Sequence, residues 1–552
     1  MRHYYGKLSA ALAVATALLL TACLSGGGGG NSGTASSAAP GPVAGTCTSV
    51  TYAAPSGAAN NIVFTFDKAY TCGQFANGDW WVSEDASGFV TITSMTPAAS
   101  GGRNGFDVNP SDKTKQRFDS VAGLATPPAP YDPTPVPGFT GFPFKVSGIS
   151  SVVKTVGGFP TGGAYQSYLQ FAAVLTVVAA PISNSNAVFR PGYFGSAGKS
   201  FYAVPSAAAV AALPAAPYTP GVSVPSAATF SIASIATRYQ HVWLDNITPS
   251  APVRLIHPTD NMPEYGRDIA TDNAVNLLRM LLSDFNYADV THKQALINYL
   301  QMAIDLKSMA AGGVTWDADG GHGNGRKLPL LVAHKVFGGT DFSNAIAASS
   351  FAEDQQVWRS GVTGEVLWGV VSTEALYWRT TRGALGELPP GGSKALADPY
   401  GRIDGGGYQV GDVFEYQICC TSKPWKYTVL ALYLLGLETP PVSLPLPATN
   451  NLVEYVERWV KYGVKASDTF ANINLATGVI TSPAHVSVAP FPAVCARPMV
   501  PSVATYGTDY GPDGAGGCIP GTNNWTTVGD GNDAVDGGPP NAFGDQLWAW
   551  YR

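Results

Sequence analysis

The spacing of hydrophobic positions changes part-way along the chain. Between residues 46 and 200, short runs of β-branched and aromatic residues alternate with clusters of Gly, Pro, Asn and Asp. This spacing is typical of antiparallel strands, and we expect a β-sandwich in this region. The predicted strands are Asn61–Phe66, Trp80–Val82, Phe89–Thr93, Ser167–Phe171 and Val174–Val178.

A helical pattern follows the strands. Residues 201–252 are rich in Ala, Ser and Pro and predict a connector. Beyond it, apolar residues recur at intervals of about 3.6 residues, which predicts helices. The predicted helices are Asp268–Phe285, Ala288–Ala311, Arg326–Phe337, Phe342–Ser349, Trp425–Leu437 and Leu452–Tyr462. Short connections favour helical hairpins stacked as an (α/α) toroid-like domain over residues 253–552, with an irregular bundle as the alternative. The predicted fold class is therefore α+β and multidomain.

The N-terminus carries an export signal. Basic residues precede an apolar run, Leu8–Leu20, that is too short to cross a bilayer as a mature helix, so residues 1–22 predict a signal peptide. The run ends in Leu20-Thr21-Ala22-Cys23, which resembles the lipobox of bacterial lipoproteins. That resemblance implies a lipid on Cys23 and an exported protein at the outer membrane or cell surface. Residues 23–45, which contain the Cys and a Gly/Ser/Ala-rich segment, predict a flexible tether.

The composition limits the kinds of partner that we expect. The hydrophobic fraction of 45% is enough to build cores, while charged residues reach only 13%. The net charge is -6 and no basic stripe is present, so the sequence lacks the electrostatic footprint that nucleic-acid binding requires. The only membrane contact that we expect is the N-terminal lipid.

Cysteine usage fits an oxidising compartment. Apart from Cys23, six cysteines remain, so up to three disulfides are possible. Cys47 and Cys72 form the natural local pair. The adjacent residues Cys419 and Cys420 then have Cys495 and Cys518 as their remaining partners. No CxxC spacing or His pair accompanies these residues, so we predict no metal site, and nothing in the sequence indicates a cofactor.

The segment from Trp316 to Lys327 concentrates the candidate chemistry. Four glycines allow close approach of a ligand, and a helix is predicted to open near Arg326. Arg326 and Lys327 would lie in the first turn of this helix, where cations oppose the helix dipole, so we expect an acidic group to offset them. Asp317, Asp319, a substrate carboxylate or a developing oxyanion are the candidates. His322 and the aromatic ring of Trp316 complete the group.

Two other segments are expected to meet this loop. Tyr265, Arg267 and Asp268 precede the first long helix, although Asp268 is alternatively its N-cap. A Gly-rich stretch between residues 378 and 416 has no periodicity, and such a loop inside a compact domain is typical of a cover over a site. It supplies Asp404, Tyr408 and Glu415. In a toroid, loops at one end of successive hairpins share a cleft.

The whole arrangement resembles α/α-toroid polysaccharide lyases and glycoside hydrolases that carry a β-sandwich domain. The resemblance implies a polysaccharide substrate and a carbohydrate-active enzyme. The preferred reading is a hydrolase, in which Asp317 or Asp319 has a raised pKa and acts as general acid. Asp404, Glu415 or Asp268 would then activate water.

Two alternatives stay open. In a lyase, Arg326 and Arg267 would neutralise a uronate carboxylate, while His322, Tyr265 or Tyr408 removes the adjacent proton. In both enzymes Trp316 and Lys327 would contact the substrate. The third possibility is a glycan-binding lipoprotein without catalytic activity.

Overall fold

The structure is a computed structural model, and it describes part of the chain. The described residues are 44–120, 131–158, 167–216, 231–248, 256–318, 321–359, 366–368, 417–437, 451–456, 473–474, 479–480, 510–512, 518–520 and 542–551. The chain divides into two compact units. The larger contains residues 36–355, 427–450 and 550–552, and the smaller contains residues 1–35, 356–426 and 451–549.

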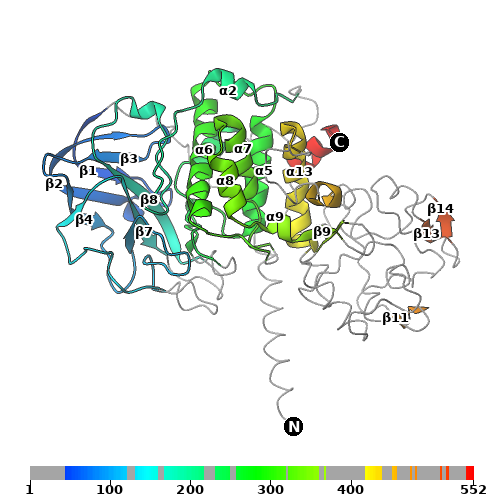
Figure 1. Cartoon of the computed structure of the whole chain (residues 1–552), viewed down its shortest axis with the longest axis horizontal. Helices are drawn as coiled ribbons and strands as arrows, with labels where there is room; N and C mark the ends of the chain where they lie inside the picture. The colour runs from blue at the N-terminus through cyan, green and yellow to red at the C-terminus, as the bar shows by residue number, and fades with distance from the viewer. Residues whose placement is uncertain are drawn as a thin grey trace, which may run out of the picture. The chain divides into compact units, whose positions relative to one another are not determined.

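The N-terminal part of the larger unit is a curled sheet of eight strands (Figure 1). The strands are β1 (Gly45–Tyr52), β2 (Ile62–Gln74), β3 (Trp80–Ser83), β4 (Val90–Thr96), β5 (Phe106–Val108), β6 (Phe144–Val146), β7 (Ser150–Gly157) and β8 (Leu169–Val178). Their order is β5-β7-β8-β3-β2-β4-β6, and β1 also pairs with β2. Each pair is antiparallel except β3 with β8, which is parallel.

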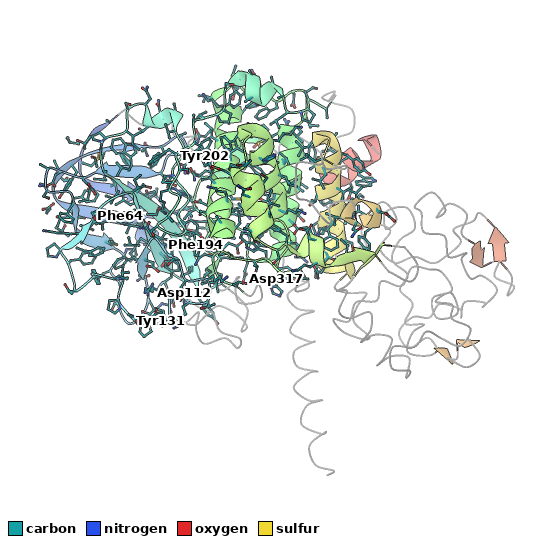
Figure 2. The ribbon with its side chains drawn as sticks, viewed as in Figure 1. Phe64, Asp112, Tyr131, Phe194, Tyr202 and Asp317 are labelled. Atoms are coloured by element: carbon teal, nitrogen blue, oxygen red, sulfur yellow. A yellow bond between two sulfur atoms is a disulfide. The ribbon has the colours of Figure 1, made fainter. Side chains whose placement is uncertain are left out.

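Alternating side chains of the strands build the core of the sheet. In β2, Ile62, Phe64 and Phe66 are buried and alternate with partly exposed residues, and Figure 2 shows Phe64 within this part of the structure. Strand β8 is buried at every position except Gln170, so both of its faces are covered. The ring of Phe171 contacts that of His241, in the later connector, at 5.0 Å.

Aromatic rings join the two ends of the sheet. Phe106 in β5 and Phe144 in β6 come from opposite ends of the strand order, yet their ring centroids lie 6.1 Å apart. Phe139 contacts both rings, at 5.0 and 5.3 Å. The described strands thus follow one hydrogen-bonded path that curls on itself, and the two separate sheets expected of a sandwich are not distinguished among them.

A disulfide joins the first two strands. Cys47 in β1 and Cys72 in β2 are bonded across a sequence separation of 25 residues, with their Cα atoms 5.9 Å apart. The predicted local pair is confirmed. Cys420 is also disulfide-bonded.

Removing the Cys47–Cys72 bond should weaken the sheet. Replacing both cysteines by alanine is expected to lower the free energy of unfolding by about 2–4 kcal/mol, because the unfolded chain regains the freedom of the loop that the bond closes. Denaturant titration of the full chain measures the change. An unaltered unfolding midpoint would show that the bond does not constrain the unfolded state.

Helices form the rest of the larger unit (Figure 1). They are α2 (Ala207–Ala211), α3 (Ile232–Arg238), α5 (Gly266–Met280), α6 (Val290–Ala311), α7 (Lys327–Phe337), α8 (Asp341–Ala348) and α9 (Ala352–Gln355). The predicted pair of long helices corresponds to α5 and α6. Asp289 caps α6 by accepting hydrogen bonds from the backbone N–H groups of Thr291 and His292. Residues 295–306 of α6 are all buried, so this helix is the centre of the helical layer.

Some boundaries differ from those expected. Tyr265 is the N-cap of α5, and Asp268 lies within the first turn, where its charge complements the helix dipole instead of capping it. The helix expected over residues 452–462 is described over 451–456.

The smaller unit contains short elements. Strand β9 (Val357–Arg359) pairs with β10 (Val366–Trp368), β11 (Ile473–Asn474) with β12 (Val479–Ile480), and β13 (Tyr510–Pro512) with β14 (Cys518–Pro520). A π-helical turn over Gln417–Ser422 leads into α13 (Lys423–Leu435), whose residues from Tyr427 onward belong to the larger unit, and α15 (Ala542–Tyr551) is the last of the described helices. Within this unit the buried amines of Lys423 and Lys426 lie 3.5 and 3.0 Å from the carboxylate of Asp545.

Candidate functional site

The loop between α6 and α7 is anchored by a buried carboxylate. Asp245, in the segment between α3 and α5, is 2% exposed. Its oxygens accept hydrogen bonds from Nε of Arg326 at 2.7 Å and from Nε1 of Trp316 at 3.0 Å. Nε2 of His257 lies 3.0 Å from the same carboxylate. These contacts attach both ends of the loop to the connector.

The guanidinium of Arg326 is buried and bonds to groups inside the protein. Its side chain is 1% exposed, and besides Asp245 it donates from Nη1 to the backbone carbonyls of His322 and Asn324 at 2.9 and 2.6 Å. Trp316 is fully buried, with its ring stacked on that of Phe351 at 5.6 Å. The substrate contacts expected of Arg326 and Trp316 do not fit this placement, because neither side chain reaches a surface that a polysaccharide can touch.

Lys327 is also buried, at 4% exposure, and its amine forms an ion pair with Asp354. The acidic groups that offset the two cations of the first turn are therefore Asp245 and Asp354. Of the acids predicted for this role, Asp317 instead accepts hydrogen bonds from Thr315, Ser350 and Gln355, and Asp319 lies outside the described residues. Lys327 is thus poorly placed to bind substrate.

Hydrogen bonds stabilise the charged form of Asp317. Its carboxylate accepts from the hydroxyl of Thr315 at 2.7 Å, from Nε2 of Gln355 at 2.9 Å and from the hydroxyl of Ser350. Partial burial raises the pKa of Asp317, but these donors outweigh it and leave the pKa below its ordinary value. A general acid needs the opposite shift, so this residue does not match the hydrolase role expected of it. Figure 2 shows Asp317 near one end of the helical layer.

Acid should reveal the contribution of Asp245. Burial raises the pKa of this carboxyl, but the charge of Arg326 and the hydrogen bond with His257 lower it to about 2. Because the folded pKa lies below the unfolded value, the stability is fully present above about pH 4 and is lost as the pH falls to about 2. We expect the wild type to lose roughly 2 kcal/mol more over this range than Asp245→Asn. Urea titrations at each pH measure it, and parallel pH profiles would contradict the expectation.

The half-buried residues of the loop meet the start of α5. The rings of His322 and Tyr265 are in edge-to-face contact, with centroids 4.8 Å apart. The phenol oxygen of Tyr265 accepts a hydrogen bond from the backbone N–H of Gly321 at 3.2 Å. Two segments that the sequence separates by 57 residues are therefore brought together, since the contact pairs residue 265 with residue 322.

A glycine makes this contact possible. A Cβ atom on Gly266 would lie 2.1 Å from the carbonyl oxygen of His322 and 2.2 Å from that of Gly321. Real Cβ atoms do not approach carbonyl oxygens so closely, so a side chain at position 266 would push the loop away from α5. This glycine was not singled out from the sequence, where only its place between Tyr265 and Arg267 is visible.

A guanidinium completes the group, which we call the Tyr265 cluster: Tyr265, Arg267, Asp268 and His322. The guanidinium carbon of Arg267 lies 5.7 Å from the centre of the Tyr265 ring. Nε and Nη2 of Arg267 donate to Asp268 at 2.8 and 3.3 Å, which orients the guanidinium. The cluster thus combines a phenol, an imidazole and a guanidinium that is ion-paired with a carboxylate, all on partly exposed side chains.

Several expected residues lie outside the described part of the chain. These are Cys23, Asp319, Asp404, Tyr408, Glu415 and Cys495, together with the side chains of Cys419 and Cys518. Among the residues that the structure does describe, no group of three or more His, Cys, Asp or Glu side chains is arranged to hold a metal ion. None of the helices described there is both long and apolar enough to cross a membrane.

Comparison with protein-family models, curated proteins and solved structures finds no match to this chain.

Proposed function

We propose that the protein is an exported, lipid-anchored polysaccharide lyase that cleaves a uronate-containing glycan by β-elimination at the Tyr265 cluster. The observation that carries the proposal is the contact between the rings of Tyr265 and His322 beside the guanidinium of Arg267. β-Elimination requires a cation at the carboxylate and a base near the neighbouring C–H group. The cluster supplies both kinds of group within one small region.

The reaction follows from these groups. Arg267 neutralises the uronate carboxylate, which makes the adjacent proton more acidic. One of the pair His322 and Tyr265 takes this proton, and its electron pair forms the new carbon–carbon double bond. The glycosidic oxygen leaves with the electrons of the broken C–O bond and receives a proton from the other member of the pair.

The described part of the chain supports the lyase better than the hydrolase. A glycoside hydrolase needs two carboxyl groups with separated pKa values, one of them raised. Asp317 instead has a lowered pKa and three internal donors. The toroid-like architecture belongs to the same proposal, and it is supported by the four consecutive helices α5, α6, α7 and α8.

Two readouts test the reaction. The full chain is incubated with neutral and with uronate-containing polysaccharides, and both ultraviolet absorbance and reducing ends are followed. A lyase produces absorbance from the new conjugated double bond on uronate substrates. Reducing ends without this absorbance would overturn the lyase in favour of a hydrolase, and binding of the polysaccharide with neither signal would leave a glycan-binding protein.

A further inference from the structure

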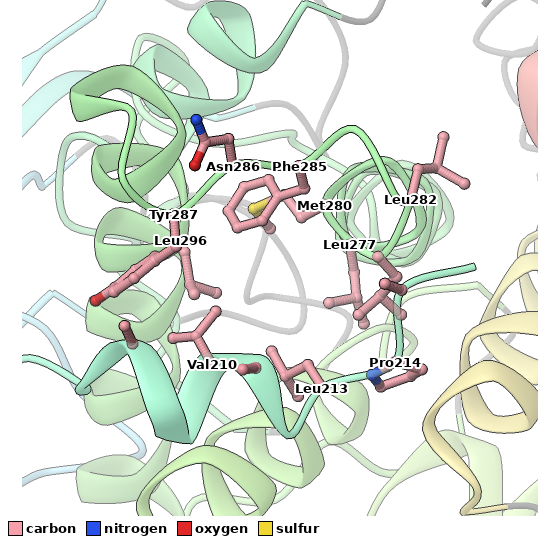
Figure 3. Close-up of a pocket in the computed structure, with 14 residues that line it drawn as sticks. Val210, Leu213, Pro214, Leu277, Met280, Leu282, Phe285, Asn286, Tyr287 and Leu296 are labelled. Atoms are coloured by element: carbon pink, nitrogen blue, oxygen red, sulfur yellow. The ribbon is translucent and has the colours of Figure 1, made fainter. Parts of the chain in front are cut away.

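A pocket that is separate from the Tyr265 cluster lies among α2, α5 and α6 (Figure 3). Its volume is about 330 Å³, within the range of small-molecule sites. Twelve of its fourteen lining residues are Ala, Val, Leu, Pro, Met or Phe, and the remaining two are Asn286 and Tyr287. The deepest wall comes from α5 and α6, where Leu277, Met280 and Leu296 are buried.

A short segment of chain spans this pocket. Residues 205–216, which we call the strap, are held at one end by the hydroxyl of Tyr287, which donates to the carbonyl of Pro205 at 2.8 Å. At the other end, Ala216 exchanges backbone hydrogen bonds with Leu281 and Ser283 at 2.7 and 2.8 Å. The strap is therefore fixed at a distance from the helices by contacts at both of its ends.

Small side chains on the strap leave the space unfilled. Ala207, Ala211 and Ala215 line the pocket opposite Leu277 and Met280, and their methyl groups fill less space than larger apolar side chains would. An unfilled apolar cavity destabilises a protein, because its walls lose the contacts that close packing provides. A ligand that fills the cavity restores those contacts and stabilises the folded state.

A lysine amine lies beside one lining residue of the pocket. The amine of Lys293 lies 5.6 Å from the centre of the Tyr287 ring, and the ring of His292 stacks on that of Phe285 at 5.3 Å. Of the nearby acids, Asp284 pairs with Arg279 at 2.7 Å, and the carboxylate of Asp289 accepts hydrogen bonds from backbone N–H groups at the start of α6. Among the residues described, none forms an ion pair with Lys293.

We propose that this pocket binds a medium-chain fatty acid, with its hydrocarbon chain between the strap and α5 and its carboxylate against Lys293. The pocket is apolar inside, and the amine of Lys293 lies over the ring of Tyr287, one of the lining residues, which matches an apolar chain that ends in one negative charge. At about 30 Å³ for each group of the size of a water molecule or a methylene, the volume corresponds to roughly ten carbons. This site is independent of the Tyr265 cluster.

Calorimetric titration of the full chain tests the site. Octanoate, decanoate and dodecanoate are each titrated below the concentration at which they form micelles, with decanol as the uncharged probe. We expect saturable binding of one decanoate per chain. Lys293→Met should weaken decanoate binding by about 5–10-fold, which corresponds to roughly 1 kcal/mol, and leave decanol binding unchanged. Lys335→Met, at an exposed lysine in α7, is the matched control and should alter neither.

Substitutions in the strap test whether the hydrocarbon chain of the ligand lies in the pocket. Val210→Phe should abolish binding of both probes, because the ring occupies the pocket. Leu213→Ala enlarges the pocket and should shift the preference from decanoate toward dodecanoate. If Val210→Phe does not fold, this shift is the test of whether the ligand lies in the pocket. Absence of saturable binding to the wild type would overturn the proposal, as would equal weakening of decanoate and decanol by Lys293→Met, or full affinity in a folded Val210→Phe variant.

Discussion

Arg190→Met is expected to lower the free energy of unfolding by about 3–5 kcal/mol, the usual cost of removing one partner from a buried ion pair. Arg190 is fully buried and joins the sheet to the helical layer. Its Nε donates at 2.6 Å to Asp79, which precedes β3, and its Nη1 and Nη2 donate at 2.9 and 2.6 Å to Asp305 in α6. The variant leaves two buried carboxylates without a cation.

The pH dependence of this loss separates charge from packing. Burial raises the pKa of Asp305, and the nearby charge of Asp79 adds to this effect, while Arg190 opposes it. Without the guanidinium, the pKa of Asp305 rises further and this acid takes up a proton on folding, so the loss should shrink as the pH falls from 7 toward 4. Urea titrations at several pH values provide the measurement.

Arg238 provides the matched control. It pairs with Asp272 at 2.7 Å, but both side chains are 31% exposed. Arg238→Met should therefore cost less than about 1 kcal/mol. Equal losses for the two arginine variants would show that Arg190 does not join the two layers through its charge.

His322→Ala is expected to reduce turnover of a uronate polysaccharide by about 10²–10⁴-fold, the usual contribution of a general acid or base. The melting temperature should change little, because the imidazole is only half-buried and meets the Tyr265 ring edge-to-face. Tyr265→Phe should cause a loss of similar size, since it removes the hydroxyl and keeps the ring. The rate of ultraviolet absorbance increase, divided by the concentration of folded protein, is the measurement.

Two variants elsewhere serve as controls. His334→Ala, in α7, and Tyr202→Phe, whose hydroxyl donates to Asp341 at 2.7 Å, remove the same groups at other positions. Both should keep wild-type turnover. If His322→Ala and Tyr265→Phe melt much earlier while their activity per folded molecule is intact, the cluster has a structural role and the proposed reaction is wrong.

Local spacing was sufficient for many elements. Alternating apolar residues identify a strand at Ile62–Phe66, and the 3.6-residue period identifies the two helices α5 and α6. In each case the apolar residues are spaced so that they lie on the buried face of the element. Strands β5 and β6 were missed, since three residues are too few to show a period. Strand β7 is buried on both faces and so does not alternate.

The candidate site was predicted in part. Tyr265 and His322 were chosen for their chemistry, and they do lie together. Arg326 was assigned to substrate although it is buried, because no local pattern indicates that its partner is Asp245, 81 residues earlier in the chain. The need for a nearby acid was predicted from the helix dipole, but the identity of that acid was not.

Three features could be predicted from the amino-acid sequence alone, since each depends on residues that are near one another along the chain. They are the change from strands to helices, the disulfide between Cys47 and Cys72, and the concentration of polar residues before α7. Packing between segments that are distant in the sequence determines which charged side chains are buried and which are partly exposed. Arg190 and Arg326 both join the interior, through partners at least 81 residues away, whereas Arg267 stays partly exposed beside Tyr265 and pairs with its neighbour Asp268. The reason is that a guanidinium enters a protein interior only where a carboxylate meets it, and such meetings are made by the fold.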